Sequence, residues 1–137
     1  MGKLHSSQAS LGFYGDELDP LEITTRLGGV PTICVAKGET WLTALGVQKV
    51  AKMGSWRRVA DKRCPGDLDS QIAPLFSGLT DDLAEWNAIA QRFRGRIFCG
   101  LFLESFNDGL TLRPETLRMI GERGLVLDLD IYERESN

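Results

Sequence analysis

The segment 96–133 carries the clearest alternation of apolar positions in the chain. Positions 97–104 form two alternating sets, and both are mostly apolar: Ile97, Cys99, Leu101 and Leu103 against Phe98, Gly100, Phe102 and Glu104. A period of two predicts a strand, and two apolar faces place it in the middle of a sheet. Positions 127–132 also alternate, with Leu127, Leu129 and Ile131 against Asp128, Asp130 and Tyr132. This last strand is expected to have one buried and one exposed face.

Shorter patterns predict the remaining elements. Strands are expected at 9–14, 31–35, 54–60 and, after the turn signal 107–109, at 110–112. A helix is predicted from Pro20 to Gly28, because Asp19 can cap it and proline suits the first helical position. Apolar spacing predicts helices that begin at Asp67 and Thr80. A last helix is expected from Pro114, with a weaker start, because Arg113 offers no side-chain acceptor.

Three segments lack such patterns. Residues 1–8 are interpreted as a mobile N-terminal tail and 134–137 as a polar C-terminal tail, which leaves 9–133 as one domain. Residues 37–53 have no clean period and are expected to form a long, partly ordered connection, a kind of loop that often carries function.

The order of elements is β-α-β-β-α-β followed by β-α-β. It predicts an α+β fold with a ferredoxin-like core, extended by a C-terminal β-α-β unit. The sheet is expected to be mostly antiparallel, with its helices on one face.

Composition and cysteine usage agree with a small intracellular domain. The 137 residues are 42% hydrophobic and 26% charged, as in soluble globular proteins. No apolar run reaches the roughly 18 residues of a membrane span, so a cytoplasmic protein without membrane contact is predicted. The three cysteines show neither a disulfide framework nor zinc-ligand spacing. Cys34 and Cys99 are expected to be buried, and Cys64 is the candidate for a reactive thiol.

Charge is distributed unevenly along the chain. Residues 37–63 hold seven Lys and Arg against two acids, whereas residues 97–137 hold eight acids against four arginines. A basic region and an acidic C-terminal end are therefore expected on one molecule, and each is a surface for a partner. The candidate partner-binding residues are Lys37, Glu39, Trp41, Lys49, Lys52, Trp56, Arg57, Arg58, Glu104, Asn107, Asp108, Asp128, Asp130 and Tyr132.

No set of catalytic residues is predicted. The one histidine, His5, lies in the expected tail, and phosphate-binding and dinucleotide-binding motifs are absent from the sequence. Asp128 and Asp130 share a strand face and, with Glu104, have the oxygen ligands that Mg²⁺ or Ca²⁺ prefers. The favoured interpretation is that they keep an edge strand soluble, so neither a metal nor a cofactor is expected.

Several stretches resemble a known family. They are GDELDPLEITTRLG at 15–28, Pro31-Thr32 with Lys37-Gly38-Glu39, Gly54-Ser55-Trp56, DLDSQI at 67–72, and the block 97–132 with FCGLFLES and LDLDIY. Together they resemble the bacterial domain-of-unknown-function family numbered 4279. The resemblance implies a small intracellular bacterial α+β domain and brings no established activity. The chain departs from the family at Arg113, where a capping serine is common, and in the connection after Glu39.

Three classes of function remain open from the sequence. The favoured hypothesis is a non-enzymatic protein-interaction module, immunity-like or accessory, because the chain offers complementary charged surfaces and no reaction centre. A nucleic-acid-binding module using the basic segment 37–63, with Trp41 and Trp56 to stack bases, is the second. A small-ligand-binding protein or an enzyme that uses carboxylates is the third. The oligomeric state is left open.

Overall fold

The computed structural model describes residues 2–133 and has an α+β fold built on a five-stranded sheet in the order β3-β6-β2-β7-β9. The sheet strands are β2 (Ser6–Gly15), β3 (Ile33–Val35), β6 (Gly54–Val59), β7 (Arg94–Phe102) and β9 (Val126–Tyr132). The helices are α1 (Pro20–Leu27), α2 (Leu68–Ile72), α3 (Leu83–Arg92) and α4 (Pro114–Glu122), with a 3₁₀ helix at Ala73–Phe76. Two small pairs complete the fold: β1 (Gly2–Lys3) with β8 (Asp108–Gly109), and β4 (Thr40–Leu42) with β5 (Gln48–Val50).

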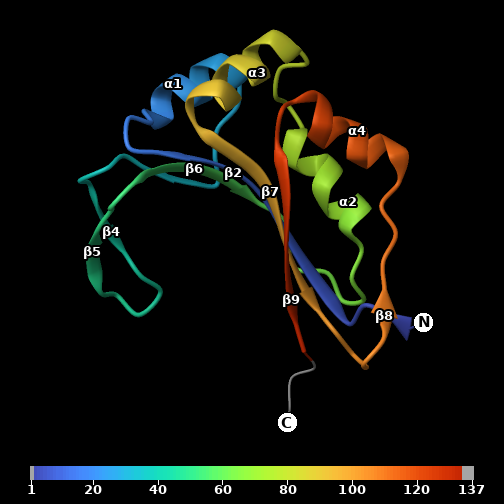
Figure 1. The fold of residues 1–137 in the computed structure, drawn as a ribbon. Helices are drawn as coiled ribbons and strands as arrows, with labels where there is room; N and C mark the ends of the chain where they lie inside the picture. The colour runs from blue at the N-terminus through green and yellow to red at the C-terminus, as the bar shows by residue number, and fades with distance from the viewer. Residues whose placement is uncertain (1, 134–137) are drawn as a thin grey trace.

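The sheet is mostly antiparallel, as predicted, and its helices lie on one side of it (Figure 1). Among the five strands of this sheet, only the neighbours β7 and β9 run parallel, joined through α4. The core lies between sheet and helices: Phe13 of β2 is paired with Trp56 of β6, and the Phe13 and Trp86 ring centroids are 6.1 Å apart. All three side chains are fully buried. Strand β7 lies between β2 and β9, which confirms its predicted interior position.

Helix α1 begins and ends where the sequence indicates. The Asp19 carboxylate accepts a hydrogen bond from the Leu21 N–H, and Pro20 is the first helical residue. Gly28 ends the helix at φ 81°, a left-handed conformation that glycine adopts without strain.

Helix α4 receives its cap from another helix. Arg113 makes no capping hydrogen bond with its side chain, as predicted. Instead, Asp69 of α2 accepts hydrogen bonds from the Arg113 N–H at 3.1 Å and from the Thr116 hydroxyl at 2.6 Å. A weak local start is thus compensated by a tertiary contact that also ties α2 to α4.

The N-terminal segment is part of the fold, contrary to the expected tail at 1–8. Strand β2 begins at Ser6, Leu4 is buried, and Gly2–Lys3 pair in parallel with β8. Sequence patterning missed this because Ser6 and Ser7 are polar yet buried. The Ser7 hydroxyl donates to the Gln71 side chain, which satisfies its hydrogen-bonding capacity inside the protein.

Two other expectations differ from the structure. The strand predicted at 110–112 does not form, and the residues that pair are 108–109. Residues 134–137, expected as a polar tail, lie outside the described residues.

Residues 37–53 form a β-hairpin, where a partly ordered connection was expected. Strands β4 and β5 pair antiparallel, and the Thr43 N–H donates to the Val47 carbonyl across the turn. Backbone hydrogen bonds between Ala51 and Glu39 and between Gly38 and Ala51 close its base. Nearly every side chain of the two strands is exposed, so no period-two pattern marked them. Figure 1 shows the hairpin as an arm that reaches away from the sheet.

Candidate functional site

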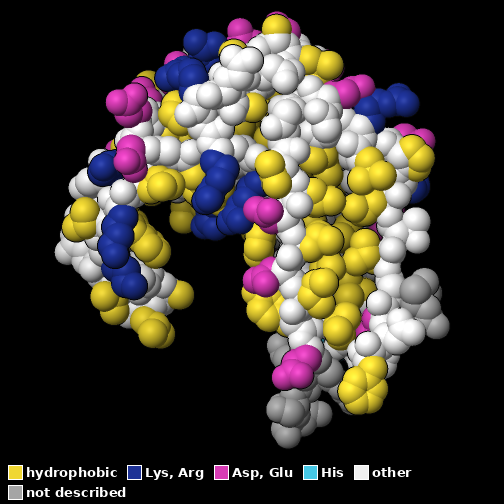
Figure 2. Space-filling view, in the orientation of Figure 1, with side chains coloured by type: hydrophobic (Ala, Val, Ile, Leu, Met, Phe, Trp, Pro, Cys, Tyr) yellow, Lys and Arg dark blue, Asp and Glu magenta, His cyan; other side chains and the backbone are white. Residues whose placement is uncertain are grey.

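One face of the sheet carries no helix and bears aromatic and arginine side chains. Pairing registers and alternation place on this open face Tyr14 from β2, Arg57 from β6, Arg94, Arg96, Phe98 and Phe102 from β7, and Asp128, Asp130 and Tyr132 from β9. Figure 2 shows a hollow between this face and the hairpin arm. Lys and Arg side chains gather at the top of the hollow, and acidic side chains lie along β9.

A pocket of about 390 Å³ lies where the hairpin meets the open face. We call it the hairpin pocket. Its apolar lining includes Tyr14, Ile33, Val35, Trp41, Val50 and Met53. Its charged lining consists of Lys49, Lys52 and Arg57, and no carboxylate is among the described residues that line it. An apolar pocket with three cations at its walls favours a ligand group that is apolar and flanked by negative charge.

Arginines and aromatic rings interleave beside this pocket. The Tyr14 ring lies 5.5 Å from the Arg94 guanidinium and 5.2 Å from that of Arg96. Arg96 also lies 4.8 Å from the Phe98 ring and forms an ion pair with Asp128 at 3.0 Å. Partial burial opposes the charge of Arg96, but hydrogen bonds to Asp128 and Tyr14 outweigh it and raise its pKa. The Arg96 guanidinium is thus held in place by two rings and a carboxylate and stays charged.

A second aromatic group lies at the other end of the open face. The Phe102 and Tyr132 rings stack at 4.8 Å, and the Lys62 ammonium lies 4.9 Å from the Phe102 ring. The Tyr132 hydroxyl donates to Asp130 at 2.6 Å, and this hydrogen bond raises the pKa of Tyr132.

Two of the predicted partner-binding residues lie on the helix side of the sheet, away from the other candidates. Trp56 is fully buried, and its indole N–H donates to the Thr24 hydroxyl at 3.0 Å. Arg58 points to the helix side of the sheet, where it donates to three backbone carbonyls. Both hold the fold together, because alternation along β6 turns them away from Arg57.

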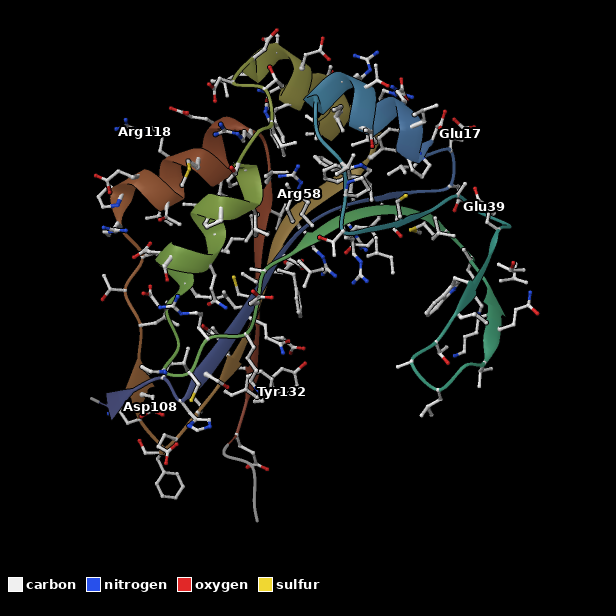
Figure 3. All side chains as sticks on the ribbon, turned by 180° about the vertical axis from the view of Figure 1, so that it is seen from behind. Glu17, Glu39, Arg58, Asp108, Arg118 and Tyr132 are labelled. Carbon is white, nitrogen blue, oxygen red and sulfur yellow. The ribbon has the colours of Figure 1, made fainter. Side chains whose placement is uncertain are left out.

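The other predicted residues form two separate groups, except Asp128, which is paired with Arg96 on the open face. Lys37, Glu39, Trp41, Lys49, Lys52 and Arg57 belong to the hairpin and the strand that follows it. Glu104, Asn107, Asp108, Asp130 and Tyr132 lie at the far end of the molecule. Figure 3 shows the separation, with Glu39 at the base of the hairpin and Asp108 and Tyr132 at the opposite end. One partner surface made of all of them is therefore not present.

The acidic residues of the far end are engaged with neighbours. The Glu104 carboxylate lies 2.8 Å from Nδ1 of His5, and Asp108 accepts hydrogen bonds from the Ser105 side chain and backbone and from the Glu104 backbone. These hydrogen bonds lower the pKa of Asp108. Within residues 2–133, no three His, Cys, Asp or Glu side chains are grouped as a metal ion requires. In the same range, no helix has both the length and the apolar character to cross a membrane.

Sequence reasoning did not name Tyr14, Arg94, Arg96 and Phe98 as candidate site residues. Because both faces of 97–104 are largely apolar, that pattern indicated a central strand and gave no sign of a surface. A signal was present just before this segment. Arg94 and Arg96 fall on the same alternate positions as Phe98, and two arginines mark that face as open to solvent.

Cysteine burial was predicted in part. Cys99 is fully buried in β7, and burial raises the pKa of its thiol to about 12. Cys34 is exposed on the short edge strand β3, so the expectation that it is buried was wrong. Cys64 is exposed, and Cys34 lies in the lining of the hairpin pocket.

Comparison with protein-family models matches residues 4–134 to one family, described as "Domain of unknown function (DUF4279)". Searches of the curated proteins and of the solved structures gave no match. The match covers nearly the whole chain, including the hairpin and all five strands of the sheet.

Proposed function

We propose, for a chain that belongs to the DUF4279 family, that it is a non-enzymatic protein-interaction module whose hairpin pocket receives an acidic segment of another protein. The accessory or immunity-like role expected from the sequence is one form of this activity. The three free cysteines of the described chain accord with a reducing compartment, and we place the protein in the cytoplasm.

The observation that carries the proposal is the one-sided charge of an apolar pocket. Lys49, Lys52 and Arg57 line it, no carboxylate of the described residues lies in the lining with them, and Trp41 remains 41% exposed. Exposed tryptophan and arginine are typical of side chains that carry binding energy at protein interfaces. An apolar side chain in the pocket, flanked by Asp or Glu, would bury Trp41 and pair the three cations.

A single-stranded nucleic acid is the second candidate. The observation that favours it is the row of rings and arginines formed by Tyr14, Arg94, Arg96 and Phe98, since bases stack on such surfaces. The chain as a whole carries a net charge of −3, and Arg96 is already paired with Asp128. A long polyanion is repelled by the net negative charge and finds one of the arginines already paired, which affects a short acidic segment less. The protein partner is therefore preferred.

Tryptophan fluorescence tests the proposal. A peptide with one leucine between glutamates is titrated into the protein and compared with its glutamine counterpart and with a mixed-sequence single-stranded oligonucleotide. Trp56 and Trp86 are buried with their N–H groups hydrogen-bonded, so the response reports on Trp41. We expect a saturable change with the acidic peptide, a weaker one with the glutamine peptide, and none in a Trp41→Phe variant.

Charge reversal at the pocket provides the matched pair of variants. Arg57→Glu should weaken binding of the acidic peptide about tenfold or more. Arg118→Glu makes the same charge change on α4, away from the hairpin (Figure 3), and should bind like the wild type. Tighter binding of the oligonucleotide than of the acidic peptide would replace the protein partner with nucleic acid. Equal binding by both variants would remove the pocket from the proposal.

The classification of the fold within the α+β class is also a proposal. We infer that β2, α1, β3, β6, α2, α3 and β7 form a ferredoxin-like core, with β9 added at one edge. Support comes from the strand order β7-β2-β6-β3, in which every neighbouring pair is antiparallel and each strand-helix-strand unit skips one position. An experimental structure of a family member with a different order would overturn it.

A further inference from the structure

Strand β9 leaves a free edge on the sheet. It is the last strand in the order, and within residues 2–133 it pairs with β7 alone. The Tyr132 carbonyl accepts a hydrogen bond from the Leu103 N–H, so in a parallel ladder the backbone groups of Leu127, Leu129 and Ile131 point away from β7. These outward N–H and C=O groups are a template for one more strand.

The two sides of this edge differ in chemistry. On the helix side, Leu129 is 47% and Ile131 61% exposed, although their paired neighbours on β7 are buried. Figure 2 shows apolar side chains gathered between β9 and the side of α4 and β8. On the open face, Asp128 and Asp130 run along the same strand. Acidic side chains are enough to protect a free edge from unwanted pairing. The uncovered apolar side has no part in that protection, so it indicates a surface for a partner.

The acidic side disfavours a second copy of this chain as the partner. Antiparallel pairing of two β9 strands about Leu129 would set Asp128 of one copy opposite Asp130 of the other, and parallel pairing in register would set like residues side by side. Like charges directly opposite each other destabilise a strand pair. The occupant must therefore bring cations to this face.

The pairing of β9 with β7, on its other edge, is a model for how such a strand binds. Strand β7 presents Arg96 to Asp128, at 3.0 Å across the ladder, while Cys99 and Leu101 pair with Leu129 and Ile131 on the apolar side. We propose that β9 accepts a strand from a different protein in which Lys or Arg alternates with apolar residues, with the cations facing Asp128 and Asp130. This site is separate from the hairpin pocket and opposite to it in charge.

Synthetic peptides test the proposal by fluorescence anisotropy. The probe is a labelled peptide of alternating lysine and valine, compared with a block peptide of the same composition and with a peptide of alternating glutamate and valine. We expect the alternating lysine peptide to bind and the other two to bind at least about tenfold more weakly. Equal binding of the block peptide, or no binding of any peptide at millimolar concentration, would overturn the proposal.

Charge exchange at Asp130 identifies the surface. Asp130→Lys should reverse the preference, so that the glutamate peptide binds better than the lysine peptide. Glu39→Lys makes the same charge change at the hairpin base and should leave the preference unchanged, and Arg57→Glu should not weaken binding of the lysine peptide. A preference that Asp130→Lys does not alter would contradict the assignment.

Hydrogen exchange on the wild-type protein keeps the test independent of any variant's folding. The lysine peptide should slow exchange of the Leu127, Leu129 and Ile131 amides, whose N–H groups face the free edge. Protection confined to the helices or the hairpin would overturn the proposal. So would sedimentation of the free protein as a dimer whose β9 amides are protected, because the occupant would then be a second copy.

Discussion

Removing the Asp69 carboxylate should uncap α4 from a distance. In Asp69→Ala, the Arg113 N–H loses its acceptor and the Thr116 hydroxyl, in a residue only 3% exposed, loses its partner. Loss of a helix cap costs about 1 kcal/mol. A buried hydroxyl left without a partner adds about 1–2 kcal/mol. The ion pair with Arg113 adds little, because that side chain is 69% exposed. We expect a loss of about 2–3 kcal/mol in the free energy of unfolding.

Urea denaturation measures this loss, because a slope of about 1–3 kcal/mol/M turns it into a midpoint shift of about 1 M at unchanged slope. Asp69→Asn keeps an oxygen acceptor and should cost clearly less. Arg113→Ser places a capping side chain at the start of α4 and should recover about 1 kcal/mol in the Asp69→Ala background, with a smaller effect in the wild type. A loss below about 0.5 kcal/mol, or no recovery by Arg113→Ser, would refute the idea that Asp69 supplies the missing cap.

Four further predictions follow from individual side chains. Arg58→Ala should lower the free energy of unfolding by about 2–3 kcal/mol, measured by urea titration, because three backbone carbonyls lose a charged donor. In the folded protein a thiol reagent should label Cys34 and Cys64 at once and Cys99 only on unfolding, and mass spectrometry of the labelled peptides checks this. Because the pKa of Cys99 is raised to about 12 in the folded protein, its thiol ionises at a lower pH in the unfolded state. The free energy of unfolding should therefore fall as pH rises above 9, and Cys99→Ala should lessen that fall. The Arg92 hydrogen bond lowers the pKa of Glu22, so ionised Glu22 stabilises the folded protein above pH 4.5, and this stabilisation is lost as the pH falls below that value. Glu22→Gln should therefore reduce the fall in melting temperature at acid pH.

The sequence predicted those elements whose signals are local. Asp19 and Pro20 mark the start of α1, and the alternation at 127–132 marks the strand β9, because caps and strand periodicity depend on neighbours in the chain. The expectation that one face of β9 is buried was wrong, since Leu129 is 47% and Ile131 61% exposed. The α+β class followed from the order of these elements.

Features that depend on distant contacts were not predictable in this way. Ser7 is buried because Gln71, far along the chain, satisfies its hydroxyl, and α4 is capped by Asp69 of another helix. The hairpin at 37–53 has exposed strands on both sides and left no pattern to find.

The candidate site was predicted in part. The basic hairpin residues Lys49 and Lys52 do line one pocket with Arg57. Arg96 and Phe98 were missed because an open sheet face that carries aromatic rings has the same apolar pattern as a buried one. Which residues such a face exposes is set by where the helices pack.

Site-specific photo-crosslinking in the native cells identifies the class of molecule that occupies the hairpin pocket. A photoreactive residue replaces Met53, which lines the hairpin pocket and is 45% exposed. We expect a protein adduct that resists nuclease, whose cross-linked peptide is rich in Asp and Glu, and which is lost with Arg57→Glu but kept with Arg118→Glu. An adduct that nuclease removes, or one that forms equally with both variants, would contradict the account.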